Sequence, residues 1–193
     1  MYRHCTTEKT AAQQRIFEKT LLEATLSEPY SSISVSQLCT LSGLSRKTFY
    51  RLFENKEDVL LALIDHTLMD YVNFSGPSDS IGKDILNEPM NLFAYWRYHK
   101  QLLDILSQTN KTSLLLERTV NHILKEQREV RKHFGVDDLP YAEEALLFYI
   151  SGIMSLGINW HHSGFARSEG EMAQLMNRLL YTAPVKHAHY IAK

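Results

Sequence analysis

The segment from 45 to 53 carries the side chains best suited to contacts with a nucleic acid. It reads Ser45, Arg46, Lys47, Thr48, Phe49, Tyr50, Arg51, Leu52 and Phe53. On an α-helix, Lys47, Tyr50 and Arg51 lie on one side, and the rings of Phe49 and Phe53 lie on the other. Arginine and lysine donate hydrogen bonds to guanine and to phosphate oxygens. The segment therefore predicts a helix that packs on its rings and presents a basic face to DNA.

Positive charge is concentrated around the basic segment, although the chain as a whole is nearly neutral. The whole chain has a formal net charge of −1, so its overall field attracts no polyanion. Between Gly43 and Lys56, however, four cations stand against the single acid Glu54, which leaves +3. A contact with DNA is therefore expected only through this local patch.

Two helix starts flank a glycine turn around the basic segment. Ser34 and Gln37 have the spacing of a capping box, so a short helix is expected to begin after Ser34 and to end near Gly43. Ser45 is placed to cap a second helix from Arg46 to Phe53. Two short helices joined by a glycine-containing turn make a helix-turn-helix, whose second helix enters the major groove of DNA.

The rest of the chain shows helical periodicity without sustained alternation, which predicts an all-α fold of about nine helices. The helices are expected over 8–27, 35–43, 46–53, 56–74, 90–107, 112–134, 139–162 and 168–181, with a loop at 75–80. The expected organisation is an N-terminal three-helix head with the helix-turn-helix over 1–56, a connecting helix over 57–74, and a helical body over 81–193.

The run from Ser42 to Glu57 resembles the DNA-binding head of the TetR family of bacterial repressors. That family's pattern is a small residue, Gly, an aliphatic residue and Ser, then Thr, an aromatic or aliphatic residue and Tyr, followed by Phe and Lys at fixed spacing. The chain matches this pattern through Lys56, and the likeness extends upstream to Tyr30 and downstream to Leu60. Beyond the N-terminal part, the agreement is only in the rhythm of the helices.

The resemblance implies a role for individual residues. Ser36, Arg46, Lys47 and Thr48 fall where the family reads bases or nearby phosphates, and Ser45, Tyr50 and Lys56 fall where it clamps the phosphate backbone. Arg51 joins this set through its place on the basic face. Tyr50 has an alternative role, which is packing against the turn. Leu52 stands where many members carry histidine or tyrosine, so that phosphate contact is expected to be missing. Lys47 replaces a frequent glycine and is expected to shift the sequence preference.

The resemblance also implies a repressor that binds an inverted-repeat operator in double-stranded DNA as a homodimer and is released by a small-molecule effector. The body over 81–193 would then serve dimerisation and effector binding. An apolar pocket suits clustered aromatic residues with a few polar groups. The expected lining is Phe93, Trp96, Tyr98, His99, Phe148, Tyr149 and Trp160. The alternative, which we favour for most of these rings, is that they form the core of the body.

The last two helices are the expected dimer contact. The helix over 139–162 is apolar nearly all round, which is typical of a helix covered on more than one side. Two such helices from each of two copies would form a two-fold seam. The expected interface residues are Leu146, Ile150, Met154, Ile158, Leu175, Met176 and Leu179. The alternative is burial of these residues inside one subunit.

Composition and motifs exclude several other classes of protein. Cys5 and Cys39 form no disulfide framework and no C-x-x-C pair, and no apolar run is long enough to span a bilayer. The N-terminus lacks the apolar core of a signal peptide, so a cytoplasmic protein without membrane contact is expected. No phosphate-binding, dinucleotide-binding, zinc-protease or serine-hydrolase motif is present. We therefore expect no enzyme, no cofactor and no metal site, and the alternative function is a helical interaction or scaffold protein that does not bind DNA.

Overall fold

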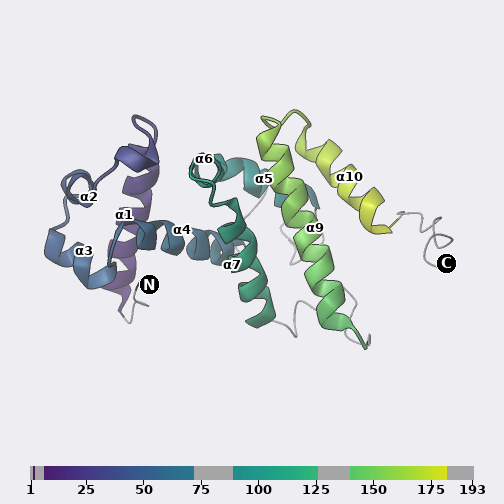
Figure 1. Cartoon of the computed structure of the whole chain (residues 1–193), viewed down its shortest axis with the longest axis horizontal. Coiled ribbons are helices and arrows are strands. Elements are labelled where there is room, and N and C mark those ends of the chain that lie inside the picture. Colours follow the sequence, from purple (N-terminus) through teal and green to yellow (C-terminus); the bar gives the residue numbers. More distant parts are fainter. Residues whose placement is uncertain (1, 3–6, 72–88, 126–139, 182–193) are drawn as a thin grey trace. The chain divides into compact units, whose positions relative to one another are not determined.

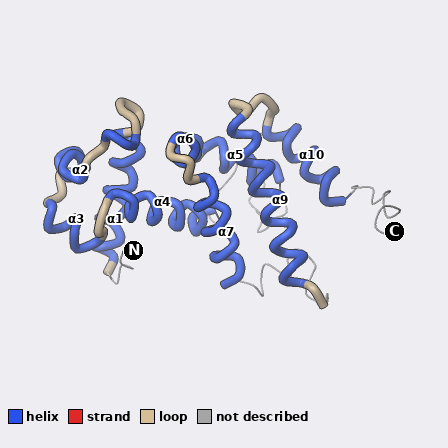
Figure 2. The backbone as a smooth tube through the Cα atoms, viewed as in Figure 1, coloured by secondary structure: helices blue, strands red, loops and turns tan. Residues whose placement is uncertain are grey.

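The computed structural model describes residue 2 and residues 7–71, 89–125 and 140–181 (Figure 1). Within these ranges there are nine α-helices and no strand, and the connections are loops and turns (Figure 2). This confirms the predicted all-α class with about nine helices. In the same ranges, no helix combines the length and the apolar character needed to cross a membrane.

The chain divides into two compact units. Unit 1 comprises residues 1–72 and 99–122, and unit 2 comprises residues 73–98 and 123–193. Unit 1 holds α1 (Glu8–Ala24), α2 (Val35–Ser42), α3 (Arg46–Leu52), α4 (Lys56–Asp70), α6 (Lys100–Gln108) and most of α7 (Thr112–Lys125). Unit 2 holds α5 (Pro89–Tyr98), α9 (Ala142–His162) and α10 (Glu169–Tyr181). The units thus differ from the expected division after residue 74, because α6 and most of α7 cluster with the N-terminal helices.

Three helix boundaries differ from the sequence-based expectation by more than one residue, and one of them is the start of α9, at Ala142 instead of residue 139. The helix expected over 90–107 is two helices, α5 and α6, because the backbone at His99 leaves the helical region (φ −93°, ψ 26°). Neither glycine nor proline marks this break, so composition gave no signal for it. The first helix ends at Ala24, three residues before the expected end. The expected extensions of α4 to residue 74 and of α7 to residue 134 run into residues outside the described ranges.

The short helices of unit 1 begin where the sequence predicts. Ser34 and Gln37 form a capping box at the start of α2, and the Ser45 hydroxyl accepts a hydrogen bond from the backbone N–H of Thr48 at the start of α3 (3.1 Å). Between them, Gly43 has φ 69°, a left-handed conformation that side chains with a Cβ rarely adopt. These local interactions set the turn between α2 and α3.

Aromatic side chains hold α3 against α1. Phe17 and Phe49 are fully buried, and their ring centroids are 5.2 Å apart in an edge-to-face arrangement. Phe53 contacts the same Phe17 ring at 5.9 Å. Each such pair contributes about 0.5–1.5 kcal/mol of stability beyond the contribution from burying the ring surfaces. Because these rings occupy the inner side of α3, its other side is left for solvent or a ligand.

In unit 2, α5 packs against α9 and α10 around the buried ring of Trp160. The indole N–H donates to the carbonyl of Arg167 at 2.9 Å, and Phe93 contacts the ring at 5.4 Å. The guanidinium of Arg97 lies 5.0 Å from the Trp160 ring and forms an ion pair with Glu169 at 2.7 Å. These contacts tie α5 to the turn between α9 and α10.

Gly157 is expected to be needed for the close packing of α9 against Trp96. A Cβ at this position would lie 2.8 Å from the Trp96 ring, so the buried ring would have to move. We expect Gly157→Ala to lose about 1–3 kcal/mol through overpacking and to regain about 0.5–1 kcal/mol of helix propensity. Urea unfolding measures the difference.

Gly152 is the matched control, because it lies on the same helix and a Cβ there meets no atom within 4 Å. Gly152→Ala is expected to leave stability unchanged or to raise it slightly. Equal effects of the two substitutions on the free energy of unfolding would contradict the packing argument.

Candidate nucleic-acid interface

The exposed side of α3 carries a basic and hydroxylated surface. Arg46, Lys47 and Arg51 are exposed, and so is Tyr50, whose side chain is 56% exposed. Phe49 lies on the buried side of the helix and contacts the Tyr50 ring edge-on at 5.4 Å. This ring contact lies within α3, and the exposure of Tyr50 favours a side chain presented to a ligand over one packed against the turn. The arrangement matches the predicted division of α3 into a packed side and a presented side.

Arg46 is held by α2. Its guanidinium donates a hydrogen bond to the hydroxyl of Ser36, on the exposed edge of α2. The same arginine lies close enough to Cys39 to oppose the rise in the pKa of that thiol, which is caused mainly by burial. Ser36 and Arg46, both predicted to contact DNA, are therefore brought together by the structure at the junction of α2 and α3.

Ser45 and Thr48 are joined at the start of α3. Their hydroxyl oxygens are 3.1 Å apart, and the Ser45 oxygen also accepts the Thr48 backbone N–H. The Ser45 hydroxyl thus fixes the first turn of the helix. Lys47, by contrast, forms no hydrogen bond or ion pair with any described residue. Its ammonium group is therefore the cation of this face that is most available to a ligand.

Arg51 points toward α1. One of its guanidinium nitrogens donates a hydrogen bond to the side-chain carbonyl of Gln13 at 2.6 Å. Sequence reasoning missed Gln13. The signal that was present is its spacing, since Gln13 lies one turn before Phe17, the residue of α1 that packs on α3.

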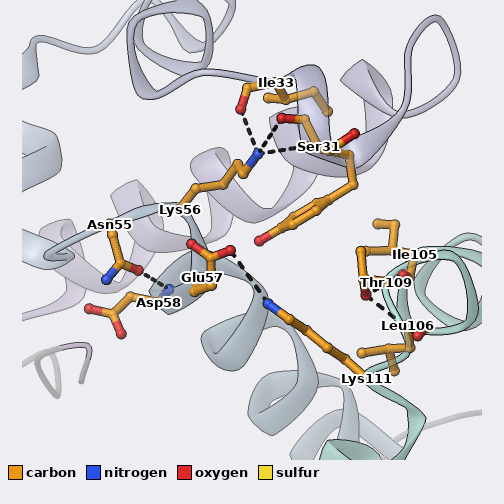
Figure 3. Close-up of polar contacts among 11 residues, drawn as sticks. Ser31, Ile33, Asn55, Lys56, Glu57, Asp58, Ile105, Leu106, Thr109 and Lys111 are labelled. Atoms are coloured by element: carbon orange, nitrogen blue, oxygen red, sulfur yellow. Dashed lines mark hydrogen bonds and ion pairs between the residues drawn. The ribbon is translucent and has the colours of Figure 1, made fainter.

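Lys56 is bonded to backbone carbonyls that precede it in the chain. Its ammonium group donates to the carbonyls of Tyr30 at 2.6 Å, Ile33 at 2.7 Å and Ser31 at 3.4 Å (Figure 3). It also lies 4.3 Å from the centre of the Tyr30 ring. An ammonium group has three donors, and all three are directed at these carbonyls. In the free chain Lys56 therefore ties α4 to the turn η1 (Tyr30–Ser32), a structural role that the sequence did not predict, and its phosphate contact stays a prediction.

The Lys56 site continues into the turn between α6 and α7. Glu57 forms an ion pair with Lys111 at 3.4 Å, and the Lys111 ammonium lies 5.9 Å from the Tyr30 ring (Figure 3). Burial, and then the Glu57 carboxylate, raise the pKa of Tyr30 above its ordinary value. Burial lowers the pKa of Lys56, an effect that Glu57 opposes. The cluster links η1, the start of α4 and the α6–α7 turn, all within unit 1.

The residues expected to line an effector pocket differ in burial and do not all belong to one unit. Phe93, Trp96 and Trp160 are buried in the packing of unit 2, which matches the alternative that they form core. Tyr98 and Phe148 are 75% and 77% exposed, and Tyr149 is half-buried. His99 belongs to unit 1, and burial lowers its pKa to about 4, opposed by Asp70. The aromatic density of the sequence therefore marks packing for three of these seven residues.

The expected dimer residues divide in a similar way. Leu146, Ile150, Met154 and Met176 are buried within the chain itself, so they are corrected from interface to core. Ile158 and Leu175 are half-buried, and Leu179 is 54% exposed. The sequence pattern identified the most apolar stripe of α9, and that stripe packs inside its own subunit. The face of α9 left exposed carries Glu144, Phe148, Gly152, Ser155 and Asn159.

The described residues contain no group of three or more histidine, cysteine, aspartate or glutamate side chains able to hold a metal ion. The arginine, lysine and tyrosine side chains on the exposed side of α3 can donate hydrogen bonds, and the arginines and the lysine can pair with anions.

Neither the protein-family models nor the curated proteins searched include a match to this chain.

Proposed function

We propose that the chain is a sequence-specific DNA-binding transcriptional regulator of the TetR type. In this proposal it represses transcription from the cytoplasm as a homodimer and is released by a small-molecule effector. The observation that carries the proposal is α3 itself. This short helix is packed through Phe49 on α1, separated from α2 by the left-handed Gly43, and exposes Arg46, Lys47 and Tyr50. A second helix of this kind, presented by a glycine turn, is what enters a major groove.

Local charge supports this function over that of a scaffold. The exposed cations of α3 are concentrated in a chain whose net charge is −1, so they form a local site for a polyanion. Arg46 is positioned at the first turn of α3, where residues of a recognition helix reach base edges. Lys47 and Tyr50 flank it with groups suited to phosphate oxygens.

A homodimer is supported by apolar side chains of unit 2 that remain exposed in the single chain. Phe148 on α9 and Leu179 on α10 are large apolar side chains that are mostly exposed. Gly152 and Ser155 lie on the same exposed face of α9 and allow close approach of another helix. In the proposed dimer this face meets its copy across a two-fold axis.

Selection from a random pool of duplexes, followed by footprinting on the selected sequence, tests the proposal. The expected footprint covers an inverted repeat whose half-sites are related by about one helical turn or a multiple of it. Affinity for this duplex should fall steeply as salt rises, because each neutralised phosphate releases counterions. Failure to enrich any sequence, with no salt-dependent binding to mixed duplexes, would favour the scaffold function. Protection of a single asymmetric half-site would contradict the dimer.

A further inference from the structure

A hydrogen bond between α1 and α3 fixes the direction of Arg51. The guanidinium donates to the Gln13 side-chain carbonyl at 2.6 Å, and the two residues are 38 positions apart in the chain. Arg51 is exposed and Gln13 is half-buried. An arginine side chain that is already ordered in the free protein loses less conformational entropy when it binds a ligand. Gln13 therefore pre-organises Arg51 for binding.

Lys9 extends this site along α1. Positions 9, 13 and 17 follow one another by about one helical turn, so they share one side of α1. Phe17 packs on Phe49 of α3, which places this side of α1 toward α3. Lys9 is exposed and forms no hydrogen bond or ion pair with another described residue. This side of α1 therefore carries, in order, the packed ring of Phe17, the amide of Gln13 and the exposed ammonium group of Lys9.

We infer that Lys9, Gln13 and Arg51 form a phosphate-binding site at the α1 edge of the interface, with Gln13 as a positioning residue. This inference rests on the proposed function, because the ligand is a backbone phosphate of bound DNA. A guanidinium has five N–H donors, and Gln13 accepts from one of its nitrogens, which leaves donors for a phosphate. Arg51 also lies in the last turn of α3, whereas base edges are read from the first turn of a recognition helix.

The test measures affinity for a fluorescent duplex of mixed sequence at several salt concentrations. Each phosphate contact contributes about 0.9 to the slope of log K against log salt concentration. Lys9→Ala and Arg51→Ala are each expected to lower the slope by about that amount. Gln13→Ala should weaken binding about threefold to tenfold, the range of a single hydrogen bond. It should have no further effect when Arg51 is already alanine, because Gln13 acts only through Arg51.

Gln13→Glu separates positioning from simple packing. A glutamate keeps the contact with Arg51 but neutralises its charge and repels the phosphate, so binding should fall below that of Gln13→Ala. Lys19→Ala is the matched control for charge, since it removes a lysine of α1 whose described partner is Glu23 on the same helix. The control is expected to keep the wild-type slope. If a variant melts early, Arg51→Lys and Gln13→Asn are measured in its place.

The outcomes distinguish this inference from the function on which it rests. Slopes for Lys9→Ala and Arg51→Ala equal to that of Lys19→Ala would overturn the phosphate site. Additive losses in the Gln13 and Arg51 double variant would overturn the positioning role. If the wild-type protein binds a selected duplex but these substitutions do not change its binding, the phosphate site is wrong and the proposed function stands. If the wild-type protein shows no salt-dependent binding to any duplex, the proposed function fails.

Discussion

Arg46→Ala is expected to relax the sequence preference of the protein, at a cost of about 1–3 kcal/mol on its best duplex. The reason is the position of Arg46 in the first turn of α3, with its guanidinium held by the Ser36 hydroxyl. A guanidinium fixed in this way donates two parallel hydrogen bonds to the acceptors of guanine, and no other base pair offers the same pair of acceptors. The measurement compares affinities for the selected duplex and for versions with one base pair changed at a time.

Two variants show whether the effect comes from base reading. Arg46→Lys keeps the charge but loses the planar fork of donors, so it should lose discrimination while keeping the salt dependence of binding. Lys47→Ala should lower the salt dependence of binding on every duplex, because an unheld ammonium acts as a point charge. A uniform loss on every duplex for Arg46→Ala, with a lower salt slope, would place Arg46 on a phosphate and contradict its base contact.

In the candidate nucleic-acid interface, the features that depend on residues close together in the sequence could be predicted from the sequence. The capping box of Ser34 and Gln37 and the cap at Ser45 each link residues three positions apart. Gly43 adopts the left-handed conformation that its place between two helices requires. The split of α3 into packed and exposed sides follows from its helical period alone. These short-range rules therefore gave both the helices of the motif and the basic side of α3.

The features that the sequence did not predict depend mostly on residues far apart in the chain. Lys56 meets the carbonyls of Tyr30 and Ile33, which lie 26 and 23 positions before it, and no local pattern reveals such partners. The apolar stripe of α9 shows that Leu146 and Ile150 are buried, but periodicity does not distinguish a neighbour in the same chain from a second copy. The break at His99 likewise has no local marker. An amphipathic pattern thus predicts that the apolar face of a helix is buried, but it does not predict which element or chain buries it.

Lys56→Ala is expected to lower the free energy of unfolding by about 1.5–3 kcal/mol, the range for a hydrogen bond to a charged group. The half-buried ammonium donates to two carbonyls at 2.6 and 2.7 Å, and its loss leaves the carbonyls of η1 without their donor. Urea unfolding measures the stability. Amide hydrogen exchange over residues 30–35 should rise, because η1 is no longer tied to α4.

Lys111→Ala is the matched control, because Lys111 lies near the same Tyr30 ring but is held only by a partly exposed ion pair with Glu57. Such pairs contribute about 0–1 kcal/mol, so this variant should unfold close to the wild type. The salt slope of DNA binding distinguishes the two roles considered for Lys56. An anchor of η1 leaves that slope unchanged at temperatures where the variant is folded, whereas a phosphate contact lowers it by about 0.9. Wild-type stability and a lower slope for Lys56→Ala would therefore indicate that Lys56 contacts DNA. Its ammonium group would then have to leave the Tyr30 and Ile33 carbonyls on binding.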